Sequence, residues 1–204
     1  MQRRFLDSFA RSGLALVACV AAMGLLASCA STSSAMRGAL AWSERLPDLQ
    51  QDGDWDMQGR AAVAIGTRGW QASVDWRQKG GDTTLRLAGP LGVGASLLRL
   101  SQAGLSINDA PPRADVVDQL QQRLGFDLPL ANLRYWLLGV PDPGSPYGVT
   151  LNERDRARQL TQAGWTIDFA RYMRFRGDWL PAALVLTHDG VRVRMAIDRW
   201  EGVR

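Results

Sequence analysis

Residues Met57 to Trp76 read MQGRAAVAIGTRGWQASVDW, and this stretch decides the fold. On each side of the segment Gly66-Thr67-Arg68-Gly69, apolar side chains recur at every second position. A period of two is typical of a strand with one buried face, and a short Gly-containing break between two such strands is typical of a hairpin. The stretch therefore predicts two antiparallel strands that are joined by a tight turn and share one apolar face.

The same period recurs in shorter runs along the rest of the chain, between short polar or Gly-rich turns. The polar segment Leu151 to Leu160 is interpreted as an edge strand, and Asp189-Gly190 is a strong hairpin signal. Because the links between the runs are short, the pattern predicts an antiparallel meander of about nine or ten strands. Besides residues 57–76, the runs lie at 83–87, 98–100, 105–107, 165–169, 184–186 and 191–197.

Three segments show helical spacing instead. The first covers residues 36–49 and should stop near Pro47, because proline interrupts a helix interior. The second covers Val116 to Leu124, with Asp115 as its N-cap. The third covers Leu130 to Leu138. Strands and helices together predict an α+β fold in which the helices cover part of the apolar face of a curved antiparallel sheet.

Two kinds of interior agree with this periodicity. In one, the helices close an ordinary packed core, and in the other they form a lid over an apolar cavity. The side chains that would line such a cavity share the apolar face of the strands or the inner side of a helix. They are Val63, Trp76, Leu85, Leu87, Leu98, Trp136 and Trp165.

The N-terminal segment has the three parts of an export signal. Arginines precede the apolar stretch GLALVACVAAMGLL, which is shorter than the roughly 20 residues of a membrane-spanning helix. It ends in Leu26-Ala27-Ser28-Cys29, the pattern of a bacterial lipobox, in which the cysteine is acylated and the chain is cut before it. A plain secretory signal is the alternative. We predict a lipoprotein signal peptide at 1–28, a lipidated tether at 29–35 that begins with Cys29, and a single domain at 36–204.

Composition argues against several classes of function. The net charge is only +4, and the 24 basic residues are interspersed with 20 acidic ones, so nucleic-acid binding is not expected. A single histidine, His188, cannot supply a His-rich metal site, and its place beside Asp189-Gly190 indicates an exposed turn residue. Asp52, Asp54 and Asp56 are interpreted as a solvated turn. Since no Gly-rich phosphate loop or G-x-S-x-G elbow is present, we expect a binding protein without catalytic residues, cofactor or metal.

Seven short motifs, in order and with matching spacing, resemble the LolB family of outer-membrane lipoprotein receptors. They extend over nearly all of the chain that follows the export signal. They are GRAAV at Gly59–Val63, SVDW at Ser73–Trp76, RLAGPLG at Arg86–Gly92, LGFDLPL at Leu124–Leu130, LRYWLLGVP at Leu133–Pro141, GW at Gly164–Trp165 and IDRW at Ile197–Trp200.

The resemblance implies a half-open, incomplete β-barrel with helices over an apolar cavity. It also implies a monomeric receptor, lipid-anchored in the outer membrane and facing the periplasm, with no enzymatic activity. Its partners would be the periplasmic carrier LolA, acylated lipoprotein cargo and outer-membrane phospholipid, because the receptor accepts lipoproteins from the carrier and inserts them into the inner leaflet. The Pro90-Leu91-Gly92 loop would place Leu91 in the membrane during release, and the alternative is that Leu91 folds back onto the core.

Two other functions fit the sequence less well. One is a structural accessory lipoprotein of an outer-membrane assembly machine, which would have a filled core. The other is a lipid-anchored hydrolase of envelope substrates, which would need a convergent set of polar residues in a cleft. A dry interior without lipid binding would favour the first.

Overall fold

The computed structural model describes residues 41–89, 94–112 and 115–202. Within these ranges it contains ten strands and three helices, as the sequence predicts. In chain order the elements are α2 Trp42–Gln51, β1 Asp54–Ile65, β2 Arg68–Lys79, β3 Asp82–Ala88, β4 Ser96–Ser101, β5 Gly104–Ile107, α3 Val116–Leu124, α4 Leu130–Leu137, β6 Tyr147–Leu151, β7 Ala157–Gln162, β8 Trp165–Phe175, β9 Asp178–His188 and β10 Val191–Gly202.

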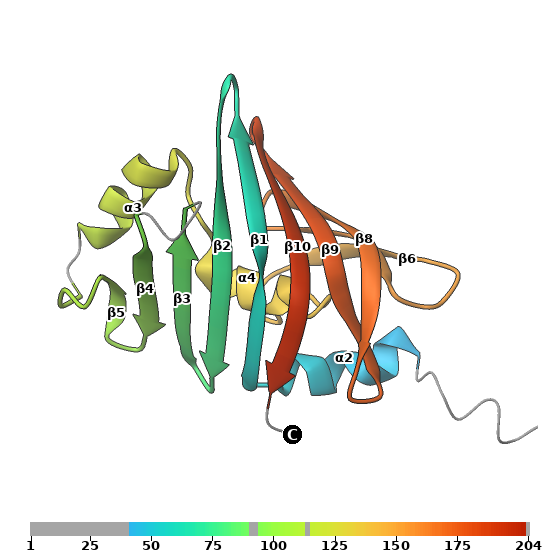
Figure 1. Ribbon diagram of the computed structural model, residues 1–204. Helices are drawn as coiled ribbons and strands as arrows, with labels where there is room; N and C mark the ends of the chain where they lie inside the picture. Colours follow the sequence, from blue (N-terminus) through green and yellow to red (C-terminus); the bar gives the residue numbers. More distant parts are fainter. Residues whose placement is uncertain (1–40, 90–93, 113–114, 203–204) are drawn as a thin grey trace, which may run out of the picture. The chain divides into compact units, whose positions relative to one another are not determined.

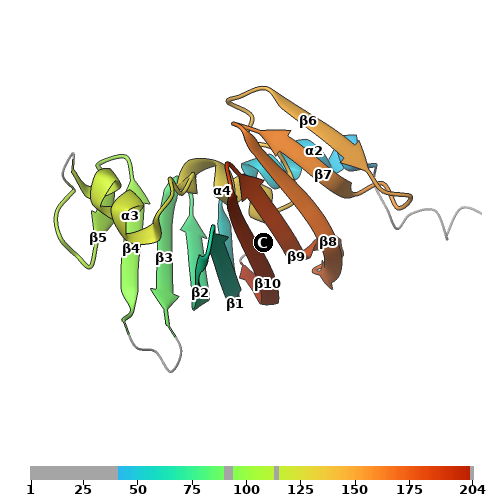
Figure 2. The ribbon, with the colours of Figure 1, turned by 90° about the horizontal axis from the view of Figure 1, so that it is seen from above.

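All ten strands belong to one antiparallel sheet, in the order β5-β4-β3-β2-β1-β10-β9-β8-β7-β6 (Figure 1). Every neighbour in this order is also a neighbour in sequence, except that β1 pairs with β10 in the middle of the sheet. The sheet curves strongly, and the three helices lie on its concave side (Figure 2). Since β5 and β6 remain as two separate edges, the barrel is not closed. The predicted α+β fold with a half-open antiparallel sheet is therefore confirmed.

The hairpin at the centre of the prediction is β1–β2. Residue pairs run in register from Asp54–Lys79 to Ile65–Arg68, so only Gly66 and Thr67 form the turn. Gly66 has a φ of +56°, which glycine adopts at no steric cost. Side chains on the concave side, such as Val63, Val74 and Trp76, are buried, whereas their sequence neighbours are mostly exposed. The apolar and polar faces are thus the ones that the alternation predicts.

Gly59 lies where β1 and β10 change register, between Gln58 and Gly59. A Cβ atom at this position would overlap the carbonyl oxygen of Ala196 and press on Ile197, both on the adjacent strand. We expect Gly59→Ala to lower the free energy of unfolding by about 1–3 kcal/mol, because the central strand pair must separate to make room. Gly81→Ala is the matched control, since a Cβ there meets open space. Urea denaturation of both variants measures the difference, and equal stability would contradict this account of the bulge.

The structure corrects two local predictions. Helix α2 does not stop near Pro47 but continues through it to Gln51, because burial of Trp42 and Leu49 outweighs one missing hydrogen bond. The predicted edge strand at 151–160 is wrong: β6 forms the edge at Tyr147–Leu151, and a turn separates it from β7. In that turn, Asn152 Oδ1 accepts hydrogen bonds from the backbone N–H groups of Arg154 and Arg156.

Polar residues near two turns also differ from expectation. Asp54 and Asp56 belong to β1 and not to a solvated turn. Asp115 makes no side-chain capping bond at the start of α3. His188 is half-buried, because its ring stacks on Trp165 with centroids 5.1 Å apart and its Nδ1 lies 2.9 Å from the carbonyl oxygen of Gly164.

The concave side is filled mainly by α4 and by tryptophans. Trp136 and Leu137 of α4 are completely buried. Trp136 Nε1 donates a 2.8 Å hydrogen bond to the buried side-chain oxygen of Gln162, so the indole carries no unsatisfied polar group into the core. Trp55 stacks on Trp76 at 5.9 Å between ring centroids. The middle of the half-barrel is therefore a packed core.

Helix α2 is held against the β6–β7 turn and the β8–β9 hairpin by polar contacts. The Trp42 backbone N–H donates to Asp155 Oδ2 at 2.6 Å, and Arg45 Nη1 lies 2.6 Å from Asp178 Oδ1. Nearby, the Arg156 guanidinium lies 3.8 Å from the ring centroid of Trp179, and burial lowers the pKa of Arg156. None of the helices in the described ranges has the length and hydropathy to cross a bilayer.

Candidate functional site

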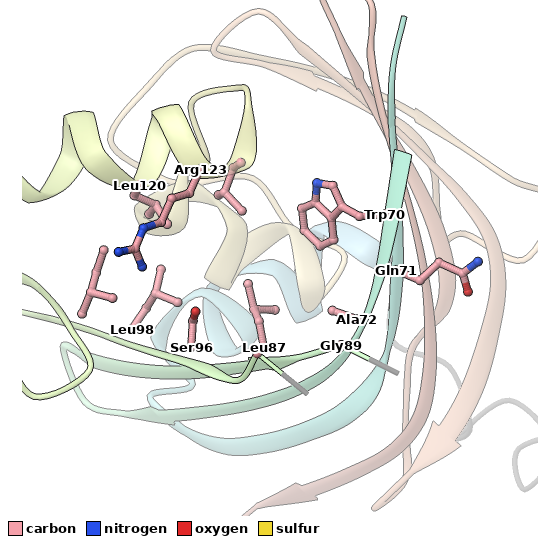
Figure 3. A pocket seen from close by; sticks show the side chains of 12 residues that line it. Trp70, Gln71, Ala72, Leu87, Gly89, Ser96, Leu98, Leu120 and Arg123 are labelled. Atoms are coloured by element: carbon pink, nitrogen blue, oxygen red, sulfur yellow. The ribbon is translucent and has the colours of Figure 1, made fainter. Parts of the chain in front are cut away.

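An apolar hollow of about 250 Å³ lies between helix α3 and the concave side of strands β2 to β5 (Figure 3). Leu87, Leu98 and Ala72 form its floor, Leu120 faces them from α3, and Trp70 stands at one side. The remaining lining residues are Gln71, Gly89, Gly94, Ser96, Ile107, Arg123 and Leu124.

The floor of the hollow follows from strand register. Leu85, Leu98 and Ile107 form one row across β3, β4 and β5, and Leu87 pairs with Ser96 in the next row. Because side chains two residues apart share a face, these rows present apolar groups to the same side of the sheet. None of the α4 residues, which fill the middle of the sheet's concave side, is among the residues that line this hollow.

The roof is the amphipathic helix α3. Val116 and Leu120 are its buried residues, and Leu124 is half-buried. The helix ends at Gly125, which has the left-handed φ of +83° that favours glycine. A Cβ there would contact Ile65 Cδ1 at 3.1 Å, so the end of α3 rests on the tip of the β1–β2 hairpin. The helix thus covers the hollow while most of its own surface remains in solvent.

A second hollow of about 490 Å³ adjoins the first on the hairpin side. Both are lined by Trp70, Arg123 and Leu124. The second is also lined by Ile65 and Arg68 from the hairpin. Ligand pockets commonly occupy about 300–1,000 Å³, so the two adjoining hollows offer the volume of one.

The structure separates the seven predicted cavity residues. Leu87 and Leu98 line the hollow under α3. Val63 lines a further shallow hollow beside Trp70. The other four are buried in the packed interior and are not among the lining residues: Trp76, Leu85, Trp136 and Trp165.

Several residues of the hollow escaped prediction. Trp70 lies an even number of residues from Trp76 in the same strand, so the alternation places both side chains on the same face of the sheet. Leu120 and Leu124 were assigned to a covering helix but not to the cavity. Arg123 gave no signal, because a basic residue in the last turn of a helix is common for reasons unrelated to ligands.

Cys29 and the Pro90-Leu91-Gly92 loop lie outside the described residues. Gly89 and Gly94, the described residues on either side of that loop, both line the hollow.

The described part of the chain offers this site little reactive chemistry. No group of three or more His, Cys, Asp or Glu side chains is placed there to hold a metal ion. The polar side chains that line the hollow under α3 are Gln71, Ser96 and Arg123. Gln71 points away from the hollow in Figure 3. The arrangement is therefore suited to holding an apolar chain rather than to general acid–base or nucleophilic chemistry.

A half-open antiparallel sheet with an apolar hollow under a helix defines the class of this protein: an α+β half-barrel of the LolA-like fold. A LolA superfamily protein from Nitrosomonas europaea has a similar fold, with a TM-score of 0.50 and 10% sequence identity over 81% of this chain and 94% of that one. A similarity at this level of identity concerns the fold alone.

Sequence comparison gives the family. The family model described as "Outer membrane lipoprotein LolB" matches residues 53–200. Outer-membrane lipoprotein LolB of Nitrosococcus oceani is 33% identical over 78% of this chain and 82% of its own length. That of Pseudomonas paraeruginosa is 30% identical over 92% and 96%. This chain belongs to the LolB family, which confirms the predicted family, the outer-membrane location and a non-enzymatic role in lipoprotein localisation.

Proposed function

We propose that this protein accepts acylated lipoproteins from the periplasmic carrier LolA and passes them to the inner leaflet of the outer membrane, while Cys29 anchors it there. The observation that carries the proposal is the apolar hollow between α3 and strands β2 to β5. Its lining is largely aliphatic or aromatic, and it lies at the end of the half-barrel where α4 leaves the sheet uncovered.

The energy of an exposed acyl chain explains why such a site is needed. A C16 chain has about 15 methylenes at about 0.8 kcal/mol each, so its exposure to water costs on the order of 12 kcal/mol. A hollow that removes even part of the chain from water offsets a large share of this cost. The transfer then proceeds downhill if the hollow binds the chain better than the carrier does and the bilayer binds it better still.

Helix α3 is suited to act as the lid. Only Val116 and Leu120 are buried, and burial of such a side chain contributes about 1.5–3 kcal/mol. An entering acyl chain therefore gains more free energy from burial than displacement of α3 costs, and the helix can move without unfolding the sheet.

One observation favours the structural accessory as a second candidate. Four of the seven predicted cavity residues are buried in the packed middle of the half-barrel, as a filled core requires. If α3 stayed closed, the hollow beneath it would hold only part of a chain. Lipid binding distinguishes the two functions, because a structural accessory has no need to bind acyl chains.

Transfer in vitro tests the proposed function. A carrier of the LolA family is loaded with a triacylated lipoprotein and mixed with the mature chain carrying Cys29→Ser, which removes the anchor but keeps the whole domain. We expect the lipoprotein to co-purify with this chain, and then to move to liposomes. If the lipoprotein stays on the carrier although the domain is folded, the receptor function fails.

The segment Pro90-Leu91-Gly92 gives a separate prediction. We expect Leu91→Glu to leave acceptance from the carrier unchanged and to slow deposition into liposomes about tenfold, equivalent to 1.4 kcal/mol, because a carboxylate resists entry into hydrocarbon. Ala103→Glu is the matched control, since Ala103 is an exposed residue of the β4–β5 turn. Liposome flotation measures deposition. Normal deposition by Leu91→Glu would contradict a membrane role for Leu91.

A further inference from the structure

We propose that the hollow of about 490 Å³ on the hairpin side binds the phosphate of a glycerophospholipid through Arg68 and Arg123, while an acyl chain of the same molecule occupies the hollow under α3. This inference rests on the proposed function in one respect, since it uses the same apolar hollow. It adds a second class of lipid, which carries a negative charge next to its acyl chains.

Arg68 and Arg123 come from different elements, and both line the 490 Å³ hollow. Arg68 is the first residue of β2 and has the strand parity of Trp70 and Ala72, so it lies on the concave side. Arg123 is in the last turn of α3, and its side chain extends over the hollow toward the strand that carries Leu98 (Figure 3). Both line the 490 Å³ hollow, which Trp70 and Leu124 join to the apolar hollow under α3.

Neither arginine has a carboxylate partner among the residues that the structure describes. Arginines on the convex face do: Arg60 pairs with Asp198, Arg77 with Asp56 and Arg86 with Asp75. In the described part of the chain, no acidic residue lines either hollow. The rim of an apolar site thus carries two positive charges without a counter-charge. Such a site is complementary to a ligand that has an apolar chain and a negatively charged group.

Phosphate is the anion that this pair fits best. A guanidinium donates two parallel N–H groups to phosphate oxygens, and the single negative charge of a phosphodiester is attracted by both positive charges. The C-terminal end of α3 has a partial negative charge, which stabilises Arg123 but offers nothing to a phosphate. Binding of the phosphate therefore depends on the two side chains, and their removal should abolish it.

The charge distinguishes this ligand from the lipoprotein cargo. A triacylated N-terminal cysteine carries its lipids on a thioether and an amide, neither of which is ionised. Such a cargo should use the apolar hollow without help from Arg68 or Arg123. Substitution of the two arginines is thus expected to separate phospholipid binding from lipoprotein binding.

The test compares two monomeric lipids by calorimetric titration of the mature chain with Cys29→Ser. The lipids are dihexanoyl phosphatidylglycerol below its micelle concentration and the uncharged dihexanoylglycerol, with inorganic phosphate as a third titrant. Arg68→Gln/Arg123→Gln is compared with Arg192→Gln/Arg194→Gln, which removes the same charge from two exposed residues on the convex face of β10.

We expect the phospholipid to bind at least about tenfold more tightly than dihexanoylglycerol, and Arg68→Gln/Arg123→Gln to remove that difference without weakening binding of dihexanoylglycerol. The convex-face variant should bind like the parent. Equal binding of the two lipids, equal losses in both double variants, or phosphate alone binding as tightly as the phospholipid would each overturn the inference. If neither lipid bound at all, the proposed function would be overturned instead.

Discussion

Trp136→Ala should lower the free energy of unfolding by about 3–5 kcal/mol, the usual loss when a buried large aromatic side chain is truncated. Trp136 is fully buried in the last turn of α4, and its ring lies near Trp165, with centroids 6.3 Å apart. Its removal leaves a cavity in the middle of the half-barrel. It also removes the hydrogen bond of 2.8 Å that Trp136 Nε1 donates to Gln162 Oε1.

The loss should extend to the loop after α4. Gln162 also donates from Nε2 to the carbonyl oxygens of Asp142 and Ser145, at 2.8 and 3.0 Å, and so ties that loop to β7. Trp136→Phe keeps most of the ring volume without the N–H and should cost clearly less than Trp136→Ala. Val117→Ala is the control, because Val117 is 49% exposed on α3. A loss below about 1 kcal/mol for Trp136→Ala, measured by denaturant unfolding, would show that the interior is not packed.

Leu87→Glu should weaken binding of a fluorescent fatty-acyl probe at least about a hundredfold, equivalent to about 2.7 kcal/mol. Leu87 is half-buried in the floor of the hollow, so the domain can fold with a solvated carboxylate there. An acyl chain that enters must remove this carboxylate from water without giving it a partner, and that costs several kcal/mol.

The control for Leu87→Glu is Ser73→Glu, which adds the same charge to an exposed position of β2 on the convex side. Its probe affinity should equal that of the parent protein. Thermal unfolding of both variants confirms that any difference arises from the hollow. Unchanged binding by Leu87→Glu would place the acyl chain elsewhere.

The fold was predictable from the sequence because its central signals are local. The alternation from Met57 to Trp76 and the Asp189-Gly190 turn are properties of short segments, and the turn has the positive φ at both residues that such a hairpin requires. Family resemblance added that the sheet is left open. Where the signal was weak, prediction failed: β6 has one half-buried residue among four exposed ones, and so shows no alternation.

The site was less predictable because it depends on how elements pack. Trp76, Leu87 and Leu98 share one face of the sheet, yet only the latter two lie under α3, whereas Trp76 stacks on Trp55. Periodicity assigns a side chain to a face but not to a place along it. The position of a covering helix decides which part of an apolar face is filled and which remains hollow. The sequence of the strands alone does not determine the position of that helix.

Direct labelling tests the central claim, that the hollow under α3 holds acyl chains. A lipoprotein with a photoreactive group near the end of one acyl chain is transferred from the carrier, irradiated, and digested for mass spectrometry. The account predicts labelled peptides from α3 and from β2 to β4, with Leu87, Leu98 or Leu120 among the modified residues. Labels confined to the convex face, or to β6 and β7 at the other edge of the sheet, would contradict it.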